Sequence, residues 1–287
     1  MFYITGDTHG SFQRIIDFVI KFNLTKDDVL IILGDVGLNF YNNKTDEKNK
    51  KILSKLPNTF FCLHGNHEIR PENISSYKTK EYKGGIVYYE EEYPNILFAK
   101  DGEIFDFEIN NEIKKVAVCG GAYSIDKYYR ILRYITYREI PEMSINEKNL
   151  FYDFCNKTTS KCNIEKDELE KINNILDKLI DFETSNKCSW WKDEQISEEN
   201  KKNFIQNLTD LNWNIDIVLS HTTPLKYEPV EWFLSNLNQS SVDKSMEEFL
   251  DTIENKLNYN KWYCGHYHGS KKIDKIQFMF NDFDELK

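Results

Sequence analysis

Short apolar segments alternate with amphipathic ones at the start of the chain. The apolar runs are rich in β-branched and aromatic residues, end at polar turns and cover residues 2–5, 29–33 and 59–63. Such runs are typical of buried strands. Apolar residues recur at helical spacing from Ile15 to Ile20, and a polar, helix-like stretch from Asp46 to Leu56 precedes the third run. This order predicts parallel strands joined by helices, and therefore an α/β fold.

From Ile86 onward the spacing changes. Apolar runs follow one another closely at residues 96–99, 104–109 and 116–119. This tight spacing is typical of a meander and predicts a second sheet. The pattern between 127 and 214 is mainly helical, most clearly at Leu169–Leu179, where one apolar face alternates with charge. The remaining predicted elements are strands at 215–219, 262–264 and 273–280 and a helix at 242–257.

No repeat or low-complexity linker divides these elements, so we expect a single domain over residues 1–287 with a mainly helical insertion at about 126–214. The longest apolar runs are far shorter than the roughly 20 residues of a membrane span. The N-terminal segment is typical of a strand that runs into a polar turn, without the basic region or the small-residue cleavage site of a secretory signal. Six scattered cysteines without CxxC spacing suggest reduced thiols. We therefore expect a cytoplasmic protein without a membrane partner.

The charge of the chain bears on its partners. The formal net charge is -10, and residues 139–214 hold 16 acidic against 10 basic residues. Because long nucleic acids are bound by basic surfaces, this balance disfavours such a partner. Small phosphorylated molecules remain compatible with it. Nothing in the sequence indicates an oligomeric state.

Polar turns after the predicted strands hold five of the six histidines. These turns are GDTH (6–9), GDVG (34–37), GNHE (65–68), SHT (220–222) and GHYHG (265–269). Because the carboxyl ends of parallel strands open on one crevice, we expect their carboxylates, imidazoles and amide to meet there. This ligand set suits Mn, Fe, Zn or Ni. Seven candidate ligands exceed what one ion takes, which favours two ions sharing a carboxylate and the hydrolysis of a phosphate ester.

Taken together and in this order, the five turns resemble the motifs of the calcineurin-like metallophosphoesterases over residues 6–269. The resemblance implies two mixed β-sheets in a sandwich flanked by helices, with two divalent metal ions at the strand ends. Manganese is the metal expected to work in vitro. Carried over by position, the first metal would be held by Asp7, His9, Asp35 and His268. The second would be held by Asp35, Asn66, His221 and His266, so that Asp35 is the bridge.

The same resemblance assigns His67 the role of general acid and Glu68 that of its support. Two cations bring the pKa of a bridging water close to neutrality and supply hydroxide as the nucleophile. The leaving alkoxide needs a proton, which His67, kept cationic by acidic surroundings, would donate. His64 precedes the same turn but is outside the family's ligand set. We expect it to pack beside the site and not to bind metal.

Residues outside the five turns are candidates for substrate binding. Arg70, Lys127 and Arg130 could clamp phosphate, because charged donors bind phosphoryl oxygens well, or could be structural charges. Aromatic side chains could line the entrance and stack on a base, and these are Tyr129, Trp190, Trp191 and Tyr227. The alternative for them is a core seam between the insertion and the sheets. Segments 120–130, 190–194 and 221–229 resemble blocks of a bacterial and phage branch of the family.

These observations predict a metal-dependent phosphoesterase that acts on a small or nucleotide-like phosphomonoester or phosphodiester. A serine/threonine protein phosphatase is an alternative, disfavoured because residues 36–39 are VGLN where that branch usually has an Asp and an Arg. A metal-dependent nuclease is disfavoured by the net charge. A non-catalytic metal-binding scaffold is the alternative of a different class. It is disfavoured because no ligand position is replaced.

Overall fold

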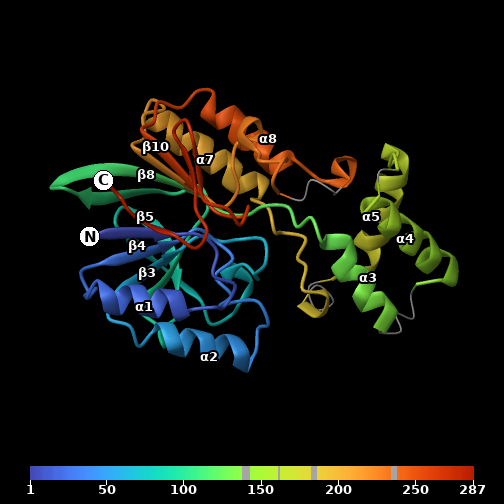
Figure 1. The fold of residues 1–287 in the computed structure, drawn as a ribbon, viewed down its shortest axis with the longest axis horizontal. Coiled ribbons are helices and arrows are strands. Elements are labelled where there is room, and N and C mark those ends of the chain that lie inside the picture. Colours follow the sequence, from blue (N-terminus) through green and yellow to red (C-terminus); the bar gives the residue numbers. More distant parts are fainter. Residues whose placement is uncertain (138–142, 161, 182–185, 234–237) are drawn as a thin grey trace.

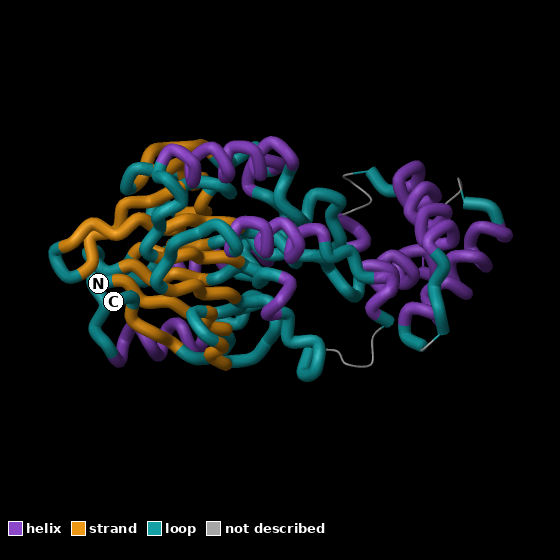
Figure 2. The backbone as a smooth tube through the Cα atoms, turned by 90° about the horizontal axis from the view of Figure 1, so that it is seen from above, coloured by secondary structure: helices purple, strands orange, loops and turns teal. Residues whose placement is uncertain are grey.

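The computed structural model describes residues 1–137, 143–160, 162–181, 186–233 and 238–287. Its strands form two mixed sheets that pack together, with helices on their outer faces (Figures 1 and 2). The seven-stranded sheet has the order β13 (Phe283–Glu285), β1 (Phe2–Thr5), β2 (Val29–Ile32), β3 (Thr59–Cys62), β6 (Ile96–Ala99), β5 (Gly85–Tyr89) and β4 (Lys78–Tyr82). The six-stranded sheet has the order β11 (Lys271–Ile273), β12 (Ile276–Phe278), β10 (Lys261–Cys264), β9 (Ile217–Ser220), β8 (Glu112–Cys119) and β7 (Ile104–Ile109).

The central strands are buried on both faces, which explains their unbroken apolar runs. Successive side chains of a strand point to opposite faces. In β2, Val29 and Ile31 pack between the two sheets, whereas Leu30 and Ile32 pack under the helices. Strands β1, β2, β3 and β6 run parallel to one another, as do β8, β9, β10 and β12. Their carboxyl ends therefore meet at one edge of the sandwich.

Four helices cover the sandwich. On the seven-stranded sheet lie α1 (Gln13–Lys21) and α2 (Lys44–Leu53), and on the six-stranded sheet lie α7 (Glu198–Asp210) and α8 (Ser245–Glu254). Short 3₁₀ turns are found at η1 (Pro71–Asn73), η2 (Leu225–Tyr227) and η3 (Gln239–Ser241). Every helix among the described residues is too short or too polar to span a bilayer.

A group of helices stands apart from the sheets (Figures 1 and 2). It consists of α3 (Lys127–Tyr137), α4 (Ile145–Thr158) and α5 (Lys166–Leu179). It has a hydrophobic core of its own, formed by Tyr128, Ile131, Ile135, Met143, Phe151, Phe154, Cys155, Ile164, Ile172, Leu176, Ile180, Cys188 and Trp190. Helix α7 lies within the predicted insertion range but packs on the six-stranded sheet. Positions 138–142, 161 and 182–185 of that range lie outside the described residues.

The predicted α/β fold with two mixed sheets flanked by helices is confirmed. Three details differ from expectation. Strand β6 belongs to the first sheet, parallel to β3, and not to a meander of the second. The hairpin of β4 and β5 was not predicted. The predicted strand at 273–280 is interrupted at Asp274, whose φ is 53°, and splits between β11 and β12. Apolar spacing identifies a strand but not its partner, which accounts for the first difference.

Candidate metal centre

Five turns at the strand ends meet between the two sheets, as the sequence predicts. The backbone of the turn after β1 is bonded to that after β2, since His9 N donates to the Asp35 carbonyl at 2.7 Å. Across the sheets, His266 N donates to Asp7 Oδ1 at 3.0 Å. Gly265 N donates to the His221 carbonyl at 3.0 Å. These bonds place turns from distant parts of the chain in contact.

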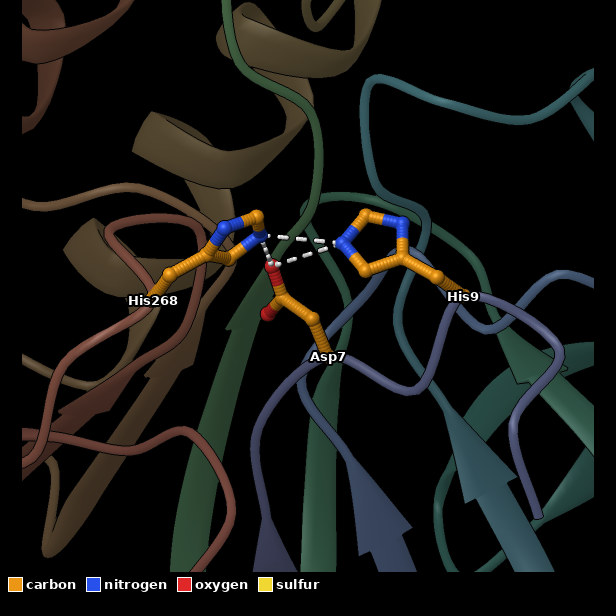
Figure 3. A group of neighbouring side chains, drawn as sticks. All are labelled: Asp7, His9 and His268. Carbon is orange, nitrogen blue, oxygen red and sulfur yellow. Dashed lines mark hydrogen bonds and ion pairs between the residues drawn. The ribbon is translucent and has the colours of Figure 1, made fainter. Parts of the chain in front are cut away.

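Asp7, His9 and His268 form the first group of side chains (Figure 3). The Nε2 atoms of His9 and His268 lie 2.9 Å apart. Asp7 Oδ2 is 3.3 Å from Nε2 of His268 and 3.8 Å from Nε2 of His9. This oxygen is buried and makes no hydrogen bond with the described residues. One carboxylate oxygen and two imidazole nitrogens therefore converge in a geometry that could hold a cation.

The second group contains Asp35, Asn66 and His221. Nδ1 of His221 lies 2.6 Å from the Leu33 carbonyl, which can only accept, so Nδ1 donates. In a neutral ring the lone pair is then on Nε2, which lies 2.9 Å from Asn66 Oδ1 and 3.7 Å from Asp35 Oδ2. Three acceptors thus face one another, and a cation between them would satisfy all three. The His266 ring lies beside this group, 5.1 Å from the His221 ring.

Asp35 lies between the two groups. Its Oδ2 is 3.9 Å from Nε2 of His9 and 3.7 Å from Nε2 of His221. Its Oδ1 accepts a hydrogen bond from His67 N at 2.7 Å. Burial raises the pKa of the Asp35 carboxyl, but the attraction of His67, His221 and His9 when their rings carry a second proton, together with the bond from His67 N, lowers it on balance. The arrangement thus provides a carboxylate that faces both groups.

The backbone of the site is unusual. His9, Asp35, His266 and His268 have positive φ angles of 46°, 46°, 65° and 48°. Each such residue costs about 1–2 kcal/mol, and strain of this kind gathers at functional sites. The glycine before Asn66 has a steric reason, because a Cβ on Gly65 would lie 2.0 Å from Asp35 Oδ1. The fold therefore accepts local strain to bring these side chains together.

Glu68 and His64 are buried and contact the backbone of the turn at 65–68. Glu68 is fully buried, and its Oε1 accepts a hydrogen bond from Gly65 N at 2.9 Å. Burial, with the nearby charge of Asp35, raises the pKa of Glu68 to about 8. His64 is also buried, and its Nε2 lies 3.1 Å from the Glu68 carbonyl. Burial lowers the pKa of His64 well below its ordinary value. The position of His64 agrees with the expected packing role.

His67 lies beside the first group, with its ring 5.6 Å from the His9 ring. The Arg130 guanidinium contacts its Nδ1. Because Arg can only donate, Nδ1 accepts and the proton of the neutral ring is on Nε2. Burial lowers the pKa of His67, Asp35 partly opposes this, and Arg130 lowers it further. The expectation that acidic surroundings keep His67 cationic is therefore wrong.

The sequence model of the calcineurin-like phosphoesterases matches residues 1–270. The chain belongs to the calcineurin-like phosphoesterase family. No curated protein matches it. Among solved structures, a phosphopantetheinyl hydrolase from Mycobacterium tuberculosis is similar, with 11% identity, a TM-score of 0.46, and coverage of 97% of this chain and 87% of that one. A similarity this low carries no inference about the substrate.

In this calcineurin-like phosphoesterase, only one of the three predicted phosphate clamps contacts the site described above. Arg130 does so through His67. Arg70 is buried and pairs with Asp101, with 2.6 Å between Nη1 and Oδ2. Lys127 points into the insertion, where its Nζ lies 4.5 Å from the centre of the Trp190 ring. In this structure Arg70 and Lys127 therefore act as structural charges and do not clamp phosphate.

The predicted aromatic entrance is also different from expectation. Trp190 and Trp191 are only 5% and 1% exposed. Trp190 belongs to the core of the insertion, and Nε1 of Trp191 donates to Asn186 Oδ1 at 2.7 Å. Tyr227 packs at η2 with its hydroxyl 3.4 Å from Glu254 on α8. None of these three rings therefore lines an open entrance in this structure: Trp190 and Trp191 are buried, and Tyr227 packs against the core of the six-stranded sheet. Tyr129 is 61% exposed.

Two residues that orient Asn66 were not identified from the sequence. Ser124 Oγ accepts a hydrogen bond from Asn66 Nδ2 at 2.9 Å, which turns Asn66 Oδ1 towards His221. Ser124 N in turn donates to Glu194 Oε1 at 3.1 Å. Both lie in the segments 120–130 and 190–194 that the sequence marks as family-like, but their contacts depend on the fold.

Proposed function

We propose that this protein is a dinuclear-metal-dependent phosphoesterase that hydrolyses a small or nucleotide-like phosphomonoester or phosphodiester. The observation that carries the proposal is the second group of side chains. His221 Nε2, Asn66 Oδ1 and Asp35 Oδ2 face one another as acceptors in a buried space, which favours a bound cation. Membership of the phosphoesterase family supplies the reaction class.

The residues fit two divalent ions. One would be held by Asp7, His9, Asp35 and His268, and the other by Asp35, Asn66, His221 and His266. Oxygen and imidazole ligands without a thiolate suit Mn, Fe, Zn or Ni, and we expect Mn to support activity in vitro. Such a pair of ions supplies a water of lowered pKa and neutralises charge on the phosphoryl oxygens.

His67 and Arg130, which lie beside the first group, would act on the leaving group and the phosphate of the substrate. For His67 to give a proton to the leaving oxygen, its ring must first hold a proton on both nitrogens. Arg130 blocks Nδ1 in this state. A phosphate group offers Arg130 two oxygens in a bidentate geometry, which would draw the guanidinium away from the ring. Substrate binding would thus release His67 for its role as acid.

The proposal is tested with Asp35→Asn and His67→Ala. Asp35→Asn should lower the metal content, because Asp35 faces both groups. His67→Ala should keep the metal content near that of the wild type and lower kcat by about 10²- to 10⁴-fold. Metal is measured by elemental analysis, and activity with p-nitrophenyl phosphate and its bis ester in the presence of Mn.

Two results would contradict this assignment. Equal loss of metal in both variants would show that His67 is a ligand. A wild-type protein that binds two metal ions but releases p-nitrophenol from neither ester would favour the non-catalytic scaffold.

A further inference from the structure

A cavity of about 510 Å³ lies between the insertion and the loop that follows β2, at Phe40 and Tyr41. Its lining includes Phe40, Tyr129, Arg130, Arg133, Tyr134 and Lys187. A volume of this size is typical of sites for small ligands. Of these six residues, the sequence identifies Arg130 and Tyr129 as candidates for substrate binding.

The cavity adjoins the candidate metal centre through Arg130. One nitrogen of this guanidinium contacts His67, and the same residue lines the cavity. His67 is the residue proposed to protonate the leaving oxygen. A group held in this cavity would therefore be the leaving group of the ester, not the phosphoryl group that is attacked.

The lining combines cations with aromatic rings. Arg130, Arg133 and Tyr134 lie at positions i, i+3 and i+4 of α3, so they share one helix face. The Arg133 guanidinium lies 6.0 Å from the centre of the exposed Tyr129 ring. Among the described residues, Arg133 has no carboxylate within ion-pair distance. Exposed Lys187 adds a further cation.

The local charge opposes that of the whole chain. Among the described residues that line the cavity, Asp126 is the one acidic residue, and Arg130 Nε donates to its Oδ2 at 2.6 Å. Arg133 therefore adds positive charge to the cavity of a protein whose net charge is -10. Guanidinium groups recognise phosphate, and tyrosine and phenylalanine rings stack on flat bases.

We propose that this cavity binds a nucleotide leaving group, that is, a base together with a second phosphate. The inference rests on the proposed function. In the reaction, water adds to the attacked phosphorus and the bond to the ribose oxygen breaks. That oxygen takes up a proton, so the products are inorganic phosphate, or a monoester, and a nucleotide with a free hydroxyl.

The first test compares adenosine 3′,5′-bisphosphate with adenosine 3′-monophosphate as substrates of the Mn-loaded protein. They differ in the second phosphate. We expect kcat/KM to be at least about tenfold higher for the bisphosphate, because one charge-assisted bond is worth that factor or more. In Arg133→Gln this preference should fall about tenfold. Lys171→Gln, an exposed residue of α5 outside the cavity, makes the same charge change and should keep the preference.

The second test needs no catalysis. Isothermal titration calorimetry with adenosine 5′-monophosphate and metal-free protein should detect binding, which Arg133→Gln weakens about tenfold and Lys171→Gln does not. If the wild type hydrolyses p-nitrophenyl phosphate but shows no preference between the adenylates, the inference is overturned and the proposed function stands. If no ester is hydrolysed, the proposed function fails. Absence of nucleotide binding by calorimetry overturns the cavity assignment in either case.

Discussion

The atoms of the candidate centre are oriented by neighbours that do not themselves face it. His221 directs its Nε2 inwards because its Nδ1 donates to the Leu33 carbonyl. Asn66 directs its Oδ1 inwards because its Nδ2 is bonded to Ser124. A side-chain amide can otherwise present either end, so the serine decides which atom a metal would meet. At the scale of single residues, the site depends on these outer bonds as much as on the ligands.

Ser124→Ala tests this dependence. Without the serine oxygen, Asn66 loses the partner that fixes its amide, and we expect the affinity for one of two metal ions to fall about 10- to 100-fold. The affinity for Mn is measured by calorimetric titration of the metal-free protein. Ser54→Ala serves as the control, because among the described residues its hydroxyl hydrogen-bonds to the Lys51 carbonyl alone. Unchanged affinity for both ions in Ser124→Ala would contradict the role given to Ser124.

Single residues also show which parts of the site could be predicted from the sequence and which could not. The five turns predict which side chains lie together, because each turn follows an apolar strand and the carboxyl ends of parallel strands lie at one edge of a sheet. They do not predict that Arg130 contacts His67, since these residues come from elements whose packing the sequence does not specify. Trp190 and Trp191 illustrate the converse. An aromatic pair in a polar segment fits an entrance and a seam equally well, and only burial distinguishes them.

At the scale of elements, the insertion is a compact unit attached to the sandwich. Arg130 Nη1 donates to the Ser189 carbonyl at 2.6 Å, which joins the two chain segments that lead into it and out of it. In the part of the chain that the structure describes, its hydrophobic core contains no residue of the two sheets. Apolar periodicity could predict the helices of this unit. It could not predict that α7 packs elsewhere, because one apolar face fits either partner.

Because the insertion has a separate core, a cavity in it should loosen the insertion alone. Phe154 on α4 is fully buried and packs edge-on against Tyr128 at 4.9 Å between ring centres. Phe154→Ala should cost about 3–5 kcal/mol of local stability. Hydrogen exchange should then accelerate in α3, α4 and α5 while β1, β2 and β3 keep their protection.

The matched control for this experiment is Tyr152→Ala, which truncates a ring that is 55% exposed on the same helix. We expect little change in exchange there. Faster exchange in the sheets of Phe154→Ala would mean that the insertion and the sandwich unfold as one unit, against this prediction.

At the scale of the whole molecule, several carboxyl groups are buried between layers. Burial raises the pKa of Glu247 to about 7 and that of Glu194 to about 7, besides that of Glu68. Glu247 lies on α8 and faces the turn after β9, where its Oε1 accepts a hydrogen bond from Thr222 Oγ1 at 2.7 Å. Its Oε2 has no hydrogen-bond partner among the described residues. The folded protein therefore favours the protonated form of this group.

Because of this buried carboxyl group, the free energy of unfolding should decrease as pH rises. The ordinary pKa of Glu247 is 4.5 and its pKa in the fold is about 7, so the folded state binds a proton more tightly than the unfolded state. Its contribution is fully present below pH 4.5 and is lost as pH rises to about 7, amounting to about 3 kcal/mol. In metal-free Glu247→Gln, which stays neutral, urea midpoints should fall less between pH 5 and 7.5 than in the wild type. Exposed Glu248→Gln should retain the wild-type slope, and equal slopes in all three proteins would show that Glu247 is ionised in the fold.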